Sequence, residues 1–306
     1  MVNKIFNLTE IWALLALFAL EIVLIKKSQI SFDSYSGVLL AVIGLLVISL
    51  IYGKNGRSLK LSQMAYFGAI TIASGIAGLI LSYLAAAASH KLFDEEYAAL
   101  DAALGLNFLE WFVFLETQPL LNYILKLAYS SLLLQLAFSV VYFSHTLQTN
   151  RNKELFWIVL LSATVTSALS AIFPALGPHY HFNFLMDKAI HIPDVLLLRS
   201  LAAETFSVTE LEGIIVLPSF HTVLAIVFSY VHRGRQVIFP AILTLNLLML
   251  ISTPTHGGHY FADIIAGAGV AIGSIAFVRH INAKNNVTPA VVSSQRKKEF
   301  ACLDKA

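Results

Sequence analysis

The chain has 306 residues, of which 58% are hydrophobic and only 12% are charged. That composition excludes an ordinary soluble globular protein, and the small net charge of +2 gives no indication of a nucleic-acid surface. The single cysteine, Cys302, excludes an intrachain disulfide and a thiolate metal cluster. We therefore expect an integral membrane protein whose apolar helices of about 20 residues each cross the bilayer.

Eight apolar segments are candidate membrane spans, so the expected fold class is all-α, a polytopic transmembrane helical bundle of about eight spans. In chain order the segments are 11–25, 37–52, 64–88, 121–145, 155–173, 213–231, 237–252 and 260–278. No small-residue cleavage site follows the first segment, so we interpret it as a retained span. It contains Glu21, which we expect to snorkel to the interface or to be paired, with Lys26 and Lys27 just beyond it.

The basic residues of the short loops predict the orientation. They gather after the second, fourth and sixth segments and in the tail, which the positive-inside rule assigns to the cytoplasm, together with both termini. Lys26 and Lys27 oppose this scheme. The acidic and aromatic segment 89–119 predicts a helix lying in the interface. We divide the chain into N-terminal spans with that helix (1–120), a catalytic bundle (121–282) and a polar cytoplasmic tail (283–306).

Three polar segments fall on the predicted outer side: the long loop 174–212, the segment 217–222 and the segment 256–263. In the last of these, His259 and Asp263 are four residues apart, so they lie on one face of a helix. A carboxylate can hold an imidazole in one tautomer and leave its other nitrogen free as a base, nucleophile or metal ligand. The alternative is a polar pair that anchors a helix end.

The other polar residues of these segments extend the pattern. His221, Ser219 and Arg199, added to His259 and Asp263, give the groups that phosphoryl transfer requires: a nucleophile, a proton donor and donors for the phosphate oxygens. His256, His259, Asp263 and His221 together could also bind Zn²⁺. His179 and His181 are expected to be loop histidines near the same site. Three glycines of the last span, Gly267, Gly269 and Gly273, are expected to allow close helix packing.

Two motifs resemble those of a known family. The segment Pro218-Ser219-Phe220-His221 and the spacing His259-x-x-x-Asp263 resemble two signatures of the type 2 phosphatidic acid phosphatase superfamily. The phenylalanine before His221 and the run Gly257-Gly258-His259-Tyr260-Phe261-x-Asp263 are most similar to the branch of inositol phosphorylceramide synthases and their bacterial relatives. The resemblance covers the second half of the chain, from about residue 123 to 277.

The resemblance implies a role for each matching residue. His259 would be the nucleophile that becomes phosphohistidine, Asp263 would orient it, His221 would be the general acid, and Ser219 would donate to the phosphate. Such enzymes need no metal and no other cofactor. The signature Lys-x6-Arg-Pro is missing.

Other residues are the best substitutes for the missing signature. Arg199 is the best replacement for the missing signature, and Lys188, earlier in the same loop, is the second candidate. Thr253 stands where the family has an arginine six residues before the nucleophile. His256 is expected to supply part of the positive charge lost there.

The expected function is that of a membrane lipid phosphatase acting on a phosphate monoester at the outer face. The alternative is a phosphotransferase that moves a phospho-headgroup to an alcohol acceptor. Substrate and acceptor would be a lipid phosphoester and water or an alcohol, in a bacterial inner membrane with the site on the extracytoplasmic side. Two alternatives from other classes are a transporter and a non-catalytic membrane scaffold. A transporter would need ionisable residues near the middle of several spans, whereas here they lie mainly at span ends. A scaffold would not require polar residues gathered at one end of the bundle.

Overall fold

The computed structural model describes residues 8–54, 56–88, 91–185, 189, 191–200 and 203–303, and of 285–303 it describes the backbone alone. The chain is 76% helical, which confirms the all-α prediction. The helices are α1 (Leu8–Lys27), α2 (Tyr35–Lys54), α3 (Leu59–Ala86), α4 (Asp94–Ala103), α5 (Phe108–Glu116), α6 (Pro119–Ser130), α7 (Leu132–His145), α8 (Thr149–Ile172), α9 (Pro178–His181), α10 (Ile192–Arg199), α11 (Phe220–Val231), α12 (Ile238–Gly257) and α13 (Phe261–Leu303).

Among the described residues, six helices are long and apolar enough to cross a membrane: α1, α2, α3, α8, α12 and the part of α13 up to Lys284. Two bent helix pairs, α4 with α5 (75°) and α6 with α7 (49°), raise the number to eight if each pair is one span. The predicted number of about eight spans is therefore confirmed, although the set of spans differs. The predicted polar tail continues α13 as a helix.

The predicted start of the sixth span, 213–231, is wrong. The helix there, α11, has only 12 residues, and the segment from Gly213 to Ser219 is not helical. Pro218 accounts for the late start, because the residue before a proline is driven out of the helical conformation. Ser219 then caps the helix, since its hydroxyl oxygen accepts a hydrogen bond from the amide of Thr222 at 3.3 Å.

The acidic and aromatic segment, predicted as one interfacial helix, forms the two helices α4 and α5. Gly105 turns the chain between them with a φ of +71°, a conformation that glycine adopts readily. Asn107 then starts α5, because its side-chain oxygen accepts from the amides of Leu109 and Glu110. We call α4 and α5 together the α4–α5 hairpin.

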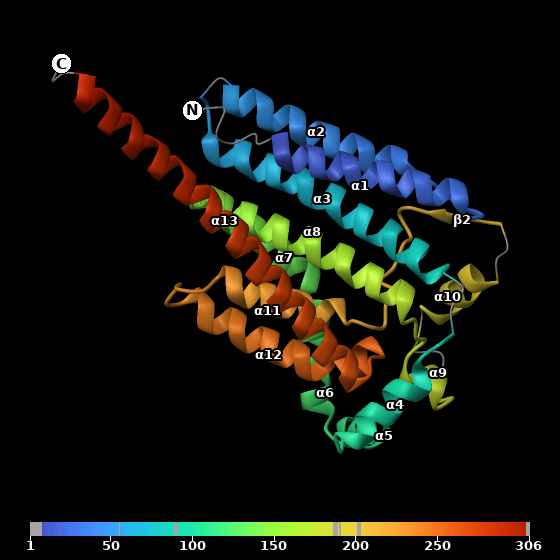
Figure 1. The fold of residues 1–306 in the computed structure, drawn as a ribbon. Helices are drawn as coiled ribbons and strands as arrows, with labels where there is room; N and C mark the ends of the chain where they lie inside the picture. The colour runs from blue at the N-terminus through green and yellow to red at the C-terminus, as the bar shows by residue number, and fades with distance from the viewer. Residues whose placement is uncertain are drawn as a thin grey trace.

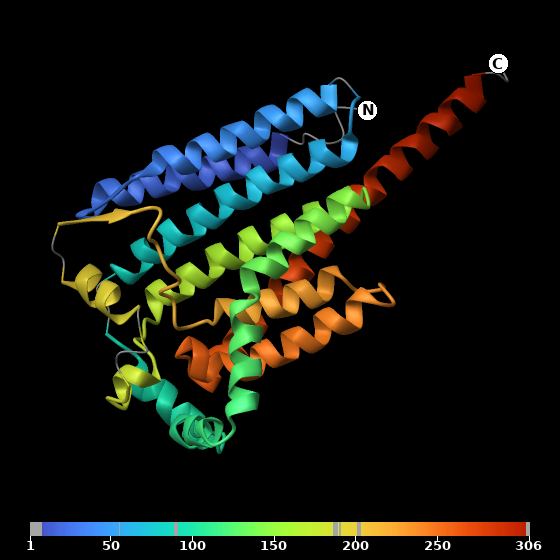
Figure 2. The same ribbon diagram turned by 180° about the vertical axis from the view of Figure 1, so that it is seen from behind.

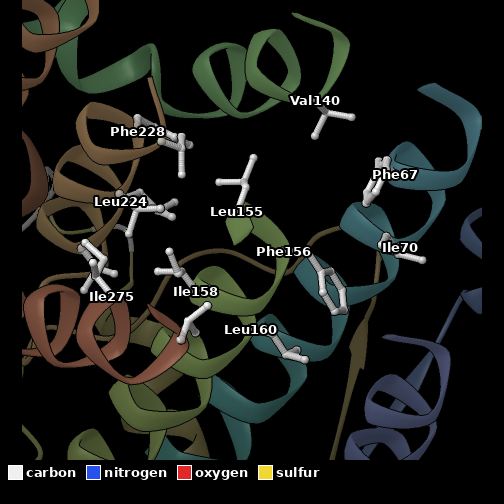
Figure 3. Close-up of a cluster of buried hydrophobic side chains, with 14 of the residues drawn as sticks. Phe67, Ile70, Val140, Leu155, Phe156, Ile158, Leu160, Leu224, Phe228 and Ile275 are labelled. Atoms are coloured by element: carbon white, nitrogen blue, oxygen red, sulfur yellow. The ribbon is translucent and has the colours of Figure 1, made fainter. Parts of the chain in front are cut away.

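Helix α8 lies at the centre of the bundle (Figures 1 and 2). Its side chains Leu155, Phe156, Ile158 and Leu160 point to both sides, toward α3 and toward α11 and α13 (Figure 3). The turns that join α2 to α3, α7 to α8 and α11 to α12 lie at one end of the bundle, toward which α13 runs (Figure 1). They carry most of the basic loop residues; that this end is cytoplasmic stays a prediction.

A short parallel pair of strands, β1 (Ile30–Asp33) and β2 (Glu204–Ser207), was not expected from the sequence. It ties the first loop to the long loop after α10. The hydroxyl of Tyr83 donates to Asp194 of α10 at 2.6 Å and accepts from the amide of Glu212 in that loop at 3.4 Å. Glu21 also differs from expectation. Its side chain is 2% exposed, and its Oε1 has no hydrogen-bond partner in the described part of the chain.

Candidate active site

The turn between α12 and α13 presents His259. Helix α12 ends at Gly257, and Gly258 follows in the left-handed conformation with a φ of +64°, which is the usual way for a glycine to end a helix. The amide of His259 donates back to the carbonyl of Pro254 at 3.1 Å. The imidazole is therefore held at the junction of two helices, only two residues before α13 begins.

Two acceptors hold one nitrogen of His259. Its Nδ1 lies 2.7 Å from the carbonyl oxygen of Val216 and 3.3 Å from Oδ2 of Asp263, which also accepts from the amide of Tyr260 at 2.8 Å. Because both groups facing Nδ1 are acceptors, Nδ1 carries the proton and the lone pair lies on Nε2. Among the described residues, Nε2 has no hydrogen-bond partner. The arrangement is that of an oriented nucleophile or base.

Helix α11 begins against the first turns of α13. The amide of Ser219 donates to the backbone carbonyl of Asp263 at 3.1 Å, and Ser219 is fully buried. A Cβ on Gly267 would lie only 2.5 Å from the carbonyl oxygen of Ser219, so this glycine allows the close approach that the sequence predicted. The same prediction is wrong for Gly269 and Gly273, since a Cβ there would meet nothing within 4 Å among the described residues.

Tyr129 of α6 joins the site, although its sequence context gave no sign of it. Its ring stacks on His221 with 3.9 Å between the centroids and 12° between the planes. The ring of His256 is 6.4 Å away, and Nδ1 of His256 is 3.1 Å from the hydroxyl oxygen of Thr255. Helix α6 therefore brings one aromatic ring beside two of the predicted site histidines.

Two carboxylates of α4 also belong to the site. Asp101 accepts from the amides of Phe261 and Ala262, both at 2.8 Å, and thereby caps the start of α13 from another helix. Asp94 accepts from the amides of Leu176 and Gly177 and from the hydroxyl of Tyr260 at 2.9 Å. Both are buried, whereas the sequence showed only an acidic interfacial stretch.

Two further histidines pack around the turn. A Cβ on Gly258 would lie 3.3 Å from Cδ2 of His179 and 3.7 Å from Cε1 of His191. His179 is 2% exposed, so it is part of the wall and not an exposed loop residue. Burial lowers the pKa of His191 below its usual value, and the neighbouring His259 and His179 act in the same direction. The sequence had singled out His179 and His181 but not His191.

The phosphate-binding role of Arg199 stays a prediction. Arg199, at the end of α10, donates from Nη1 to the carbonyl oxygen of Ala88 at 3.4 Å, just past the carboxyl end of α3. Lys188 lies outside the described residues. Within the described part of the chain, no group of three His, Cys, Asp or Glu side chains is arranged to hold a metal ion.

A groove of about 660 Å³ runs beside the site. Its lining is mainly apolar and comes from the α4–α5 hairpin, the end of α12 and the start of α13, with Leu106, Trp111, Phe114, Ile251, Pro254 and Phe261 among its residues. Pro254 and Phe261 flank His259 in the sequence, and Pro254 accepts its amide hydrogen bond. Residues on both sides of the turn therefore line the groove, whereas His259 itself does not.

A family model described as PAP2 superfamily matches residues 95–277, which is more than half of the chain. The match begins in α4 and ends in α13, so it includes every helix that contributes to the site and leaves out α1, α2 and α3. No curated protein and no solved structure matched the chain in the corresponding comparisons.

Proposed function

Because the chain belongs to the type 2 phosphatidic acid phosphatase (PAP2) superfamily, whose membership indicates phosphatase or phosphotransferase activity, we propose that it hydrolyses a phosphate monoester of a lipid through a phosphohistidine. One observation carries the proposal. Nδ1 of His259 faces the carbonyl of Val216 and the carboxylate of Asp263, which leaves the lone pair of Nε2 available for attack.

In the proposed reaction, the lone pair on Nε2 of His259 attacks phosphorus. The bond from phosphorus to the lipid oxygen breaks with its electron pair, and that oxygen takes a proton from His221. Water then attacks the phosphohistidine and gives a proton to His221. The electrons of the N–P bond return to Nε2, and inorganic phosphate leaves. Asp263 stabilises the positive charge that develops on the ring during the attack.

The start of α11 supports phosphate binding at this place, whereas the first amides of α13 are already bonded to Asp101. Helix N-termini favour anions, because their amides are not used within the helix and their dipole is positive there. Ser219 lies at this start, and His259 lies just before α13, whose first amides Asp101 accepts. In this proposal Ser219 and His256 donate to the phosphate oxygens, and the basic turns at the other end of the bundle support an extracytoplasmic location for the site.

The groove beside the α12–α13 turn supports a lipid as the substrate. An apolar groove lined by Pro254 and Phe261, on either side of the turn with the nucleophile, suits an acyl chain, since burying each CH₂ group contributes about 0.8 kcal/mol. The phosphate would then lie at the histidines while the chain follows Trp111 and Phe114 toward the membrane.

Transfer to an alcohol is the second candidate. The residues that favour it are Phe220, in the place before His221, and the run from Gly257 to Asp263, which are most similar to the synthase branch. An alcohol would attack the same phosphohistidine that water attacks. The intermediate is shared, so the acceptor distinguishes the two candidates and the histidines do not.

Phosphate release from short-chain phosphatidic acid, measured in detergent with EDTA, tests the proposal. We expect His259→Ala and His221→Ala to lower kcat/KM by at least about 100-fold, the effect typical of losing a nucleophile or a general acid. His145→Ala, which removes an exposed histidine at the end of α7, is the matched control and should keep native activity. Full activity in both site variants would refute the histidine mechanism. No release by the native protein, but transfer from a phosphodiester lipid to an alcohol, would select the second candidate.

A further inference from the structure

Tyr129 is a half-buried tyrosine whose hydroxyl has no hydrogen-bond partner among the described residues. Tyr129 is the penultimate residue of α6, just before the 49° bend into α7. Its hydroxyl oxygen is not one of the buried side-chain oxygens without a partner in the described part of the chain, so solvent reaches it. A hydroxyl that stays unpaired beside a candidate active site is available for a bound ligand.

The position of Gly257 fixes where that hydroxyl is. A Cβ built on Gly257 would be 2.7 Å from the hydroxyl oxygen of Tyr129 and also 2.7 Å from Cδ2 of His259. Both atoms therefore border one small space that only a glycine leaves open. Cδ2 is bonded to Nε2, so the hydroxyl lies near the part of the imidazole that carries this nitrogen.

The same ring also holds His221. Its stack on Tyr129, at 3.9 Å between centroids, places the proposed general acid on one side of the phenol, while His259 lies across Gly257. The chain of contacts from His221 through Tyr129 to the space above Gly257 joins the two histidines. A phosphate bound between them would have one of its oxygens within reach of the phenol.

We propose that Tyr129 is a catalytic residue, whose hydroxyl donates a hydrogen bond to a non-bridging oxygen of the phosphate bound between His221 and His259. The proposal rests on the proposed function. Tyr129 also supplies a donor for the phosphate. The described hydrogen bond of Arg199, in contrast, goes to the carbonyl of Ala88, just past the end of α3. A neutral hydroxyl is strongest as a donor when the acceptor is an anion, as a phosphate is.

The first test is steady-state kinetics of Tyr129→Phe, which keeps the stack on His221 and removes the hydroxyl alone. We expect kcat/KM to fall by about 10- to 100-fold, the range for losing one hydrogen bond to a charged group. Tyr123→Phe is the matched control, since it removes an exposed hydroxyl from the same helix. If Tyr129→Phe keeps native activity while Tyr129→Leu loses it, the ring only positions His221 and the proposal is wrong.

The second test does not depend on the lipid. Orthovanadate mimics phosphate, and its binding can be followed by calorimetry in detergent. We expect Tyr129→Phe to bind it about 10-fold or more weakly than the native protein, and Tyr123→Phe to bind it equally well. Equal binding by Tyr129→Phe, or no binding by the native protein, overturns the proposal. Weaker binding by Tyr129→Phe, in a protein that turns over no phosphoester, would keep the contact with Tyr129 and reject the proposed function.

Discussion

Substitution of Asp101 should lower the free energy of unfolding by an amount that can be worked out from its hydrogen bonds. Its two oxygens each accept one amide at 2.8 Å, from Phe261 and Ala262, and the side chain is 4% exposed. Asp101→Asn keeps one acceptor oxygen but turns an NH₂ group toward the other amide, so one of the two hydrogen bonds is lost. Loss of an N-cap costs about 0.5 to 2 kcal/mol, and loss of a hydrogen bond to a charged group costs about 1.5 to 3 kcal/mol.

We therefore expect Asp101→Asn to lower the free energy of unfolding by about 2 kcal/mol, and Asp101→Ala, which loses both bonds, by about 3 kcal/mol. Activity should fall more than stability explains. His259 lies two residues before the capped amides, and a displacement of about 1 Å at a reacting group can cost about 100-fold in rate. The expected signature is a kcat at least 10-fold lower at a temperature where the variant is fully folded.

The assay is thermal unfolding in detergent, followed by phosphate release well below the unfolding transition. Glu95→Gln is the matched control, because it makes the same carboxylate-to-amide change at an exposed position of α4. An Asp101→Asn variant that unfolds at the same temperature as Glu95→Gln would refute the capping argument. A variant that is destabilised but keeps native kcat would refute the link between the cap and His259.

Two further predictions concern the α12–α13 turn. Gly257→Ala should abolish activity, because its Cβ would lie 2.7 Å from both His259 and the hydroxyl of Tyr129; Gly269→Ala, which meets nothing, should stay active in the same assay. Because burial lowers the pKa of His191, the unfolded chain binds the extra proton and stability should fall as the pH drops below about 6.5. His191→Gln should flatten that fall in melting temperature between about pH 7.5 and 5, and an unchanged slope would contradict it.

The parts of the site that the sequence predicted are those with a local signature. His259 and Asp263 are one helical turn apart, and the structure brings them to 3.3 Å. Ser219, which the motif singled out, caps α11, although the expected span began at residue 213. These features follow from spacing and capping chemistry within a few residues, so they can be read without knowing the fold.

The parts that were missed depend on contacts between distant segments. Asp101 meets Phe261 across 160 residues and Asp94 meets Tyr260 across 166. No periodicity within α4 carries that information, because an acidic helix that caps another helix has the same local pattern as an acidic helix exposed to water. Tyr129 was missed for the same reason, since aromatic residues are common in membrane helices.

The boundary drawn at residue 120 illustrates the consequence. It was placed where the acidic segment ends and the next apolar segment begins, and it assigned α4 to the N-terminal part. The family match begins at residue 95, and α4 supplies both the cap of α13 and the carboxylate that holds Tyr260, while the division at residue 120 stays a prediction. Hydropathy separates segments that favour water from segments that favour lipid. An active site combines residues from any segments that the fold brings together.

The α4–α5 hairpin connects substrate binding with chemistry in the proposed enzyme. Asp101 holds the start of α13, Asp94 holds Tyr260 and the loop at Leu176, and Trp111 with Phe114 lines the groove. Because one bent element makes all these contacts, an acyl chain that shifts the hairpin also acts on the turn that carries His259. Binding energy from the remote part of a lipid can then contribute to orienting the nucleophile, which is how contacts far from the reacting bond raise kcat. In this arrangement the hairpin belongs to the catalytic machinery, although none of its residues is proposed to touch the phosphate.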